Sequence, residues 1–149
     1  MNTETATPNT VQTKKRILIV EDEVNMQELL KFRLQENGYE VAVAGEGFVA
    51  LTKVRTFRPH LIILDLMLPK MDGYTICRLL KFNDGYKGIP VLILSARSSE
   101  DDISRGMAMG ADGYMTKPYE PAELLAKIKE LLNPAPPSDS AGPAAPNPG

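Results

Sequence analysis

Five short apolar runs alternate along the chain with segments whose apolar residues recur at helical spacing. The runs predict strands over Arg16–Val20, Glu40–Ala44, Leu61–Leu64, Pro90–Leu94 and Gly113–Thr116. The first, third and fourth runs are continuously apolar, as strands buried on both faces require. The alternation therefore predicts strands that lie inside a sheet covered by helices.

The segments between the runs predict helices. The expected buried face of the first helix is Met26, Leu29, Leu30 and Leu34, with Asn37-Gly38 closing it, and that of the second is Ala50, Leu51 and Val54, with Pro59 stopping it. Further helices are predicted over 72–82, 100–109 and 121–132. Five strand–helix pairs predict an α/β fold. We expect a (βα)5, doubly wound, flavodoxin-like sheet of five parallel strands in the order 2-1-3-4-5.

The two ends of the chain lack this pattern. Residues 1–15 are rich in Thr, Asn and Gln, and residues 133–149 are rich in Pro and Ala. Neither end carries enough apolar surface to offset the entropy of ordering it. The sequence predicts a folded unit over residues 16–132 between two disordered segments.

Composition narrows the class of protein. The net charge of −2 across 149 residues disfavours direct nucleic-acid binding, because no basic stripe is present. No apolar run is long enough to predict a membrane span, and nothing resembles a secretory signal. The single cysteine, Cys77, is expected to be a buried helix residue and fits a reducing compartment. We therefore expect a cytoplasmic protein.

Polar residues stand where the predicted strands end. Glu21-Asp22-Glu23 follows the first strand, Asp65 the third, Ser95 the fourth and Lys117 the fifth. The carboxyl ends of parallel strands share one edge, where ligands bind in this class of fold. Clustered carboxylates favour Mg²⁺, with Mn²⁺ as the alternative ion, and a cation together with Lys117 would neutralise an incoming phosphoryl group. The pattern is compatible with a site that forms an aspartyl phosphate.

Each of these residues also has a simpler interpretation. Asp22 could cap the first helix, Ser95 could be a turn residue and Lys117 could be a solvated loop charge. His60, the only histidine, is expected to be exposed and without a catalytic role.

Four segments, 17–23, 64–73, 90–97 and 110–119, closely resemble the signatures of the receiver domains of two-component response regulators. The chemotaxis regulator is one such protein, and segments 17–23 and 64–73 are most similar to the receivers of winged-helix transcription factors. The resemblance covers residues 16–132. It implies the same fold and strand order as the apolar pattern.

The resemblance implies a role for each residue of the cluster. Asp65 would accept a phosphoryl group from a phosphohistidine on a sensor histidine kinase or phosphotransfer protein. Asp22 and Asp65 would bind Mg²⁺ directly with the backbone oxygen of Met67, and Glu21 would act through a metal-bound water. Ser95, in place of the commoner threonine, and Lys117 would contact phosphoryl oxygens.

Other positions are implied to tune the switch. Tyr114 stands at the aromatic switch position, and the Lys117-Pro118 peptide is often cis in the family. Met67 and Arg97 flank the path of the hydrolytic water. Because a thioether cannot orient water and a guanidinium can cover the phosphoryl group, we expect slow dephosphorylation.

The output is expected to be a protein-binding face formed by the fourth helix, fifth strand and fifth helix. We expect a stand-alone regulator that is monomeric or forms a weak phosphorylation-dependent dimer, since Ile103 and Gly113 replace charged residues used for dimer salt bridges. The alternative is a receiver domain cut from a DNA-binding response regulator.

A phosphatase of the haloacid dehalogenase type is disfavoured because Met67 stands where its catalytic acid is needed. The chain is thus expected to be a signalling domain and not an enzyme.

Overall fold

The computed structural model describes residues 14–133, which form one parallel sheet covered by helices. The strands are β2 (Arg16–Val20), β3 (Glu40–Ala44), β4 (Leu61–Leu64), β5 (Val91–Ser95) and β6 (Gly113–Thr116). All neighbouring strands pair in parallel, in the order β3-β2-β4-β5-β6. Counted along the chain, this is the predicted order 2-1-3-4-5. The segments predicted to be disordered lie almost wholly outside the described residues.

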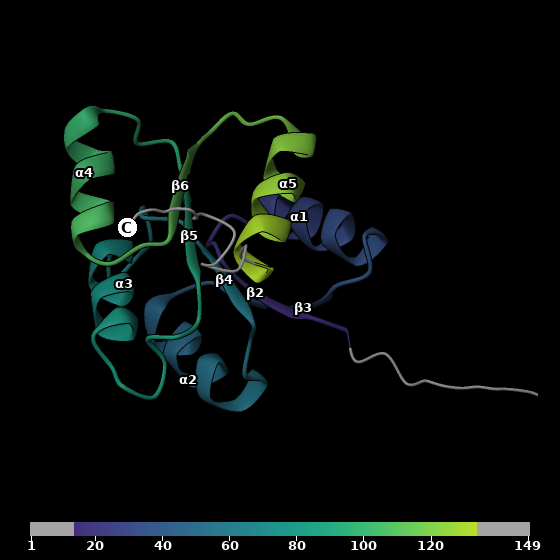
Figure 1. The fold of residues 1–149 in the computed structure, drawn as a ribbon, viewed down its shortest axis with the longest axis horizontal. Helices are drawn as coiled ribbons and strands as arrows, with labels where there is room; N and C mark the ends of the chain where they lie inside the picture. Colours follow the sequence, from purple (N-terminus) through teal and green to yellow (C-terminus); the bar gives the residue numbers. More distant parts are fainter. Residues whose placement is uncertain (1–13, 134–149) are drawn as a thin grey trace, which may run out of the picture.

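Five helices connect and follow the strands. They are α1 (Val24–Glu36), α2 (Gly47–Phe57), α3 (Gly73–Lys81), α4 (Glu100–Ala108) and α5 (Pro121–Leu132). Local signals set where they begin: Asp72 accepts a hydrogen bond from the Thr75 amide, Ser99 accepts one from the Asp102 amide, and a proline opens α5. Figure 1 shows α1 and α5 together on one side of the strands, with α2, α3 and α4 on the other.

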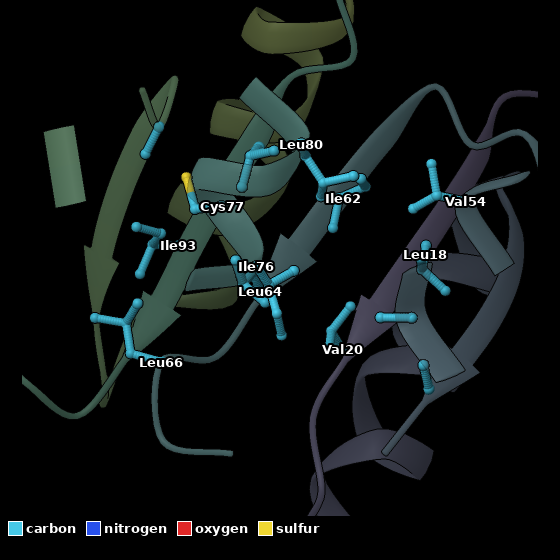
Figure 2. Close-up of a cluster of buried hydrophobic side chains, with 14 of the residues drawn as sticks. Leu18, Val20, Val54, Ile62, Leu64, Leu66, Ile76, Cys77, Leu80 and Ile93 are labelled. Carbon is cyan, nitrogen blue, oxygen red and sulfur yellow. The ribbon is translucent and has the colours of Figure 1, made fainter. Parts of the chain in front are cut away.

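The sheet separates two apolar cores. Alternate residues of β2 point to opposite faces, so Leu18 and Val20 pack with α2 and α3, and Ile17 and Ile19 pack with α1 and α5. Figure 2 shows the first core, in which Ile76, Cys77 and Leu80 of α3 cover strands β4 and β5. Each fully buried aliphatic side chain contributes about 1.5–3 kcal/mol to folding. This two-sided burial holds the polar strand ends in a fixed register.

Several details differ from the sequence predictions. Strand β5 is displaced by one residue, so that Ser95 is its last residue and is fully buried. Leu29 is 46% exposed, whereas Leu30 and Leu34 form the buried side of α1. His60 is half-buried and not exposed, because its Nδ1 accepts a hydrogen bond from the Arg16 amide at 2.9 Å. The prediction for Cys77 is confirmed: it is buried in α3, and burial raises the pKa of its thiol to about 11.

Within residues 14–133, no helix is long and apolar enough to cross a membrane.

Candidate functional site

The register of the sheet brings Glu21 and Asp65 together. Val20 of β2 pairs with Leu64 of β4, so the residues that follow them leave the sheet side by side. The ladder continues past the strand ends, since the Asp65 amide donates to the Val20 carbonyl at 3.0 Å and the Glu21 amide to the Ala44 carbonyl at 3.0 Å. Both residues are buried, with only 4% of Glu21 and 7% of Asp65 exposed.

Lys117 joins the two acids from the other side of the site. Its amide donates to the Ser95 carbonyl at 2.8 Å, which continues the pairing of β5 with β6. Its Nζ lies 2.8 Å from Glu21 Oε1 and 3.0 Å from Asp65 Oδ2. The Lys117-Pro118 peptide that follows is cis. One ammonium therefore bridges two carboxylates at the carboxyl edge of the sheet.

The second oxygen of Asp65 is held by the loop after β4. Asp65 Oδ1 accepts a hydrogen bond from the Met67 amide at 3.0 Å, and the Met67 side chain is 53% exposed. Gly73 at the start of α3 packs on the same loop, because a Cβ there would stand 2.5 Å from the Asp65 carbonyl oxygen. Only glycine allows this approach, and the Gly73 amide donates to the Leu66 carbonyl at 3.0 Å. Asp65 is thus anchored to both β4 and α3.

The three acids after β2 have three different settings. Glu21 Oε2 accepts the Glu23 amide at 3.0 Å, and Glu23 Oε1 in turn accepts the Met26 amide at 2.8 Å. Glu23 is therefore the N-cap of α1, and the interpretation of Asp22 as that cap is wrong. Asp22 is exposed at the end of β2. The Asp22 carboxylate does not cap α1, so it can have another role.

Ser95, Arg97 and Tyr114 form the neighbouring part of the site. Ser95 is fully buried, and its hydroxyl oxygen accepts the Arg97 amide at 3.2 Å. The Tyr114 hydroxyl donates to the Arg97 carbonyl at 2.7 Å. The Arg97 guanidinium pairs with α4, since its Nη1 lies 3.8 Å from Asp102 Oδ1. The structure thus ties the β5–α4 loop to Tyr114 and to α4.

Burial and charge oppose each other at this site. Burial raises the pKa of Glu21, and the hydrogen bond from Lys117 offsets only part of that effect. Burial alone would lower the pKa of Lys117, but its hydrogen bonds to Glu21 and Asp65 outweigh burial and raise it. Burial also raises the pKa of Tyr114 to about 12, so its hydroxyl remains a hydrogen-bond donor at neutral pH.

The donor set fits a hard divalent cation. Glu21, Asp22 and Asp65 supply oxygens, and with all groups ionised their charge exceeds that of Lys117 by two. Within residues 14–133, no three acidic, histidine or cysteine side chains form a complete metal site by themselves. The ligand set expected from the sequence, which adds a backbone oxygen and a water to the carboxylates, stays a prediction.

Chemically, the arrangement offers one carboxylate that is held by a backbone amide and by an ammonium. Such a carboxylate can act as a nucleophile toward an electrophilic phosphorus, and the ammonium can neutralise the oxygens of the transferred group. Sequence reasoning missed Gln27, whose side-chain amide donates to the Glu21 carbonyl oxygen. It also missed the packing of Gly73 on Asp65. Neither residue carries a charge that would have marked it.

Comparisons with known proteins show the family of this chain. The family model for the response regulator receiver domain matches residues 17–129. The chain is 41% identical over 119 residues to the DNA-binding response regulator MtrA of Mycobacterium tuberculosis, a match that covers 80% of this chain and 51% of MtrA. It is 43% identical over 118 residues to the alkaline phosphatase synthesis transcriptional regulatory protein PhoP of Bacillus subtilis, covering 79% and 48% of the two chains.

Solved structures show the same similarity. The chemotaxis protein CheY4 of Vibrio cholerae superimposes with a TM-score of 0.75 at 31% identity, covering 80% of this chain and 99% of that one. The BeF3-activated receiver domain of Klebsiella pneumoniae RstA gives a TM-score of 0.75 at 32% identity, covering 79% and 98%. The chain spans about half the length of the curated relatives it matches.

Proposed function

Since this chain belongs to the response regulator receiver domain family, we propose that it accepts a phosphoryl group on Asp65 from a phosphohistidine of a sensor histidine kinase or phosphotransfer protein. The observation that carries the proposal is the position of the Asp65 carboxylate, which is held at 3.0 Å by both the Met67 amide and the Lys117 ammonium. In the transfer, an Asp65 oxygen bonds to phosphorus while the bond from phosphorus to the histidine nitrogen breaks. The bonding electrons return to the imidazole of the donor.

The neighbouring side chains would support this step. Lys117 is already within hydrogen-bond reach of Asp65 and would shift to the phosphoryl oxygens as they arrive. The Ser95 hydroxyl lies on the adjacent strand and would donate to another of these oxygens. The transfer replaces one negative charge on Asp65 by a dianionic group, so both donors gain a stronger partner.

Receiver domains generally use Mg²⁺ for phosphorylation, and the donor set here fits that ion. In this chain, Asp22, Asp65 and the Met67 carbonyl would hold it, with Glu21 acting through water. When bound, Mg²⁺ would neutralise charge on the phosphoryl oxygens. Mn²⁺ could replace it because it also prefers oxygen ligands.

A surface on α1 would receive the phosphodonor protein. Val24, Leu29 and Phe32 are 62%, 46% and 63% exposed, on the side of α1 away from buried Leu30 and Leu34. Val24 begins α1 directly after the acids of the site. An apolar surface that starts at the mouth of a site is suited to a docking partner that must place its reactive group there.

The response would be carried by Ser95 and Tyr114. If phosphorylation draws the Ser95 hydroxyl toward Asp65, the space it leaves favours the Tyr114 ring in its present position, bonded to the Arg97 carbonyl. The face formed by α4, β6 and α5 would then be held in the shape described here and bind an effector. A complete shift of a two-state switch needs about 5.5 kcal/mol of differential stabilisation.

Two outputs are compatible with this switch. We favour a regulator that acts by binding another protein, as a monomer or a weak phosphorylation-dependent dimer. The second candidate is the receiver part of a DNA-binding regulator, which the names of MtrA and PhoP and the half-length match favour. The length of the endogenous protein, measured by immunoblotting, would distinguish them.

A phosphatase of the haloacid dehalogenase type is not supported, because the chain belongs to the receiver family and has Met67 in place of the required acid.

The proposal is tested by incubating the protein with acetyl phosphate and Mg²⁺ and measuring its intact mass. We expect one phosphoryl addition to the wild type, none to Asp65→Asn, and a normal addition to the matched control Asp72→Asn. Asp72 caps α3, a role that asparagine also fills. Equal labelling of Asp65→Asn and wild type would refute the assignment. Chelation of the divalent ion should abolish the addition.

A further inference from the structure

Helices α3 and α4 lie on the side of the sheet away from α1 and α5 (Figure 1), and residues of both line a groove. Its volume is about 700 Å³, and the residues that line it include Thr75, Arg78, Leu79, Phe82, Arg105 and Met109. Leu79 and Phe82 are 48% and 68% exposed, although the same helix already buries Ile76, Cys77 and Leu80 against the sheet. Helix α3 therefore has a second apolar side that the described fold does not cover.

Basic groups flank this apolar strip. Arg78 stands on α3 and Arg105 on α4, and neither forms an ion pair among residues 14–133. The Arg105 guanidinium instead lies 4.1 Å from the centre of the Tyr74 ring at the base of the groove. Aromatic, methionine and arginine side chains around an apolar centre are typical of protein-binding surfaces.

We propose that this groove binds an amphipathic helix of a partner protein, whose apolar row packs on Leu79, Phe82 and Met109 and whose carboxylates pair with Arg78 and Arg105. The proposal rests on the proposed function, because it names a binding surface that the switch controls. Charge complementarity selects an acid-flanked partner, since none of the described residues that line the groove is acidic. A helix fits because the groove runs between two helices of nine residues, each about 13 Å long. The apolar centre disfavours nucleic acid, whose backbone needs cations throughout its footprint.

The width of the groove is linked to the phosphorylation site through both helices. At its start, α3 packs on Asp65 through Gly73. Helix α4 packs on the Tyr114 ring through Gly106, where a Cβ would stand 3.0 Å from ring atom Cδ2. The Tyr74 hydroxyl of α3 donates to Asp102 of α4, either to its carbonyl at 3.2 Å or to Oδ1 at 3.3 Å. A change at Asp65 or Tyr114 therefore moves one wall of the groove relative to the other.

In this structure Tyr114 already has the position that phosphorylation is proposed to favour. The groove as described is then the form that phosphorylation stabilises. Phosphorylation raises the population of this form of the protein. A partner whose shape fits this form of the groove therefore binds the phosphorylated protein more tightly.

The test uses two fluorescent amphipathic peptides about 18 residues long, since shorter isolated helices are marginal in water. Both carry one row of leucines, flanked by glutamates in one peptide and by lysines in the other. By fluorescence anisotropy, we expect the glutamate peptide to bind at least about tenfold more tightly than the lysine peptide. Acetyl phosphate with Mg²⁺ should strengthen that binding several-fold in the wild type and not in Asp65→Asn.

Matched variants locate the binding surface. Phe82→Ala and Arg78→Glu should each weaken binding of the glutamate peptide about tenfold or more. Phe48→Ala and Arg55→Glu, on the exposed side of α2, should leave it unchanged. The phosphoryl addition measured by intact mass should be normal in all four variants.

The outcomes separate this inference from the proposed function. If the wild type gains no phosphoryl group, the proposed function fails. If it is phosphorylated but binds both peptides equally, binds neither, or loses binding equally in the α2 controls, the groove assignment is overturned. Preferential binding of a nucleic-acid probe, or self-association through Phe82 in sedimentation, would also overturn it.

Discussion

At the scale of single residues, Met67 and Arg97 stand two positions after Asp65 and Ser95 but occupy different surroundings. The Met67 side chain is 53% exposed beside the loop that holds Asp65. The Arg97 guanidinium is turned toward α4 and lies 3.8 Å from Asp102. Of the two residues expected to slow hydrolysis, Arg97 is held by an ion pair on α4, whereas Met67 lies on the loop that holds Asp65.

We predict that Met67→Asn shortens the half-life of phospho-Asp65 several-fold, because an amide can orient the attacking water and a thioether cannot. Arg97→Glu should have a smaller effect, since Arg97 must first leave Asp102 to cover the phosphoryl group. Phosphate-release kinetics measure both changes, and a tenfold acceleration corresponds to about 1.4 kcal/mol of barrier. Decay rates within error of wild type in both variants and in the double variant would contradict this account.

At the scale of secondary-structure elements, the contact between α3 and the end of β4 is the tightest backbone approach at the site. A Cβ on Gly73 would meet two backbone atoms, the Asp65 oxygen at 2.5 Å and Leu66 Cα at 2.6 Å. Backbone atoms cannot rotate away as the end of a side chain can, so relief requires α3 to move.

Gly73→Ala should therefore destabilise the fold by about 1–3 kcal/mol, the usual cost of forcing extra volume into a packed interior. Urea unfolding measures the change, and acetyl phosphate labelling should slow in the same variant because Asp65 shifts with the loop. Gly88→Ala is the matched control, since a Cβ there meets nothing within 4 Å. Equal stability of the two variants would show that α3 is not held against Asp65 in the way described.

The sequence predicted the helices and strands more accurately than it predicted the contacts of single residues. Continuous apolar runs located the three inner strands, β2, β4 and β5, because two-sided burial leaves little choice of residue type. The same reasoning placed Leu29 on the buried side of α1, where the structure exposes it, since a helix with several leucines can be rotated without changing its composition. Among Glu21, Asp22 and Glu23, the residue type could not show which one caps α1, because adjacent acids offer the same chemistry. The tie between Tyr74 and Asp102 joins residues far apart in the chain and leaves no local pattern.

At the scale of the whole molecule, the ion pairs of the site contribute to the stability of the fold. Lys117 is 17% exposed at its side chain and bridges Glu21 and Asp65, whose side chains are 5% and 9% exposed. Removing the ammonium leaves two buried carboxylates close together without a counter-charge. Breaking a fully buried pair costs roughly 3–5 kcal/mol, and partial exposure reduces that cost here.

We predict that Lys117→Ala lowers the free energy of unfolding in a buffer with chelator, and that Mg²⁺ restores more stability to this variant than it adds to the wild type. A cation that binds only the folded state stabilises that state. When the ammonium is absent, its positive charge no longer offsets the two carboxylates, so they attract the cation more strongly. Thermal unfolding with and without Mg²⁺ provides the measurement, with Lys129→Ala, at an exposed position of α5, as the control. A variant that responds to Mg²⁺ no more than wild type does would contradict the proposed metal position.

The central claim is that Asp65 is the residue that carries the phosphoryl group. The most direct measurement is to phosphorylate the protein with acetyl phosphate and Mg²⁺, reduce it with borohydride, which converts an aspartyl phosphate to homoserine, and locate the modified position by tandem mass spectrometry. The account predicts homoserine at position 65 and at no other acidic position. Modification of Asp22 or of any residue other than Asp65 would contradict it.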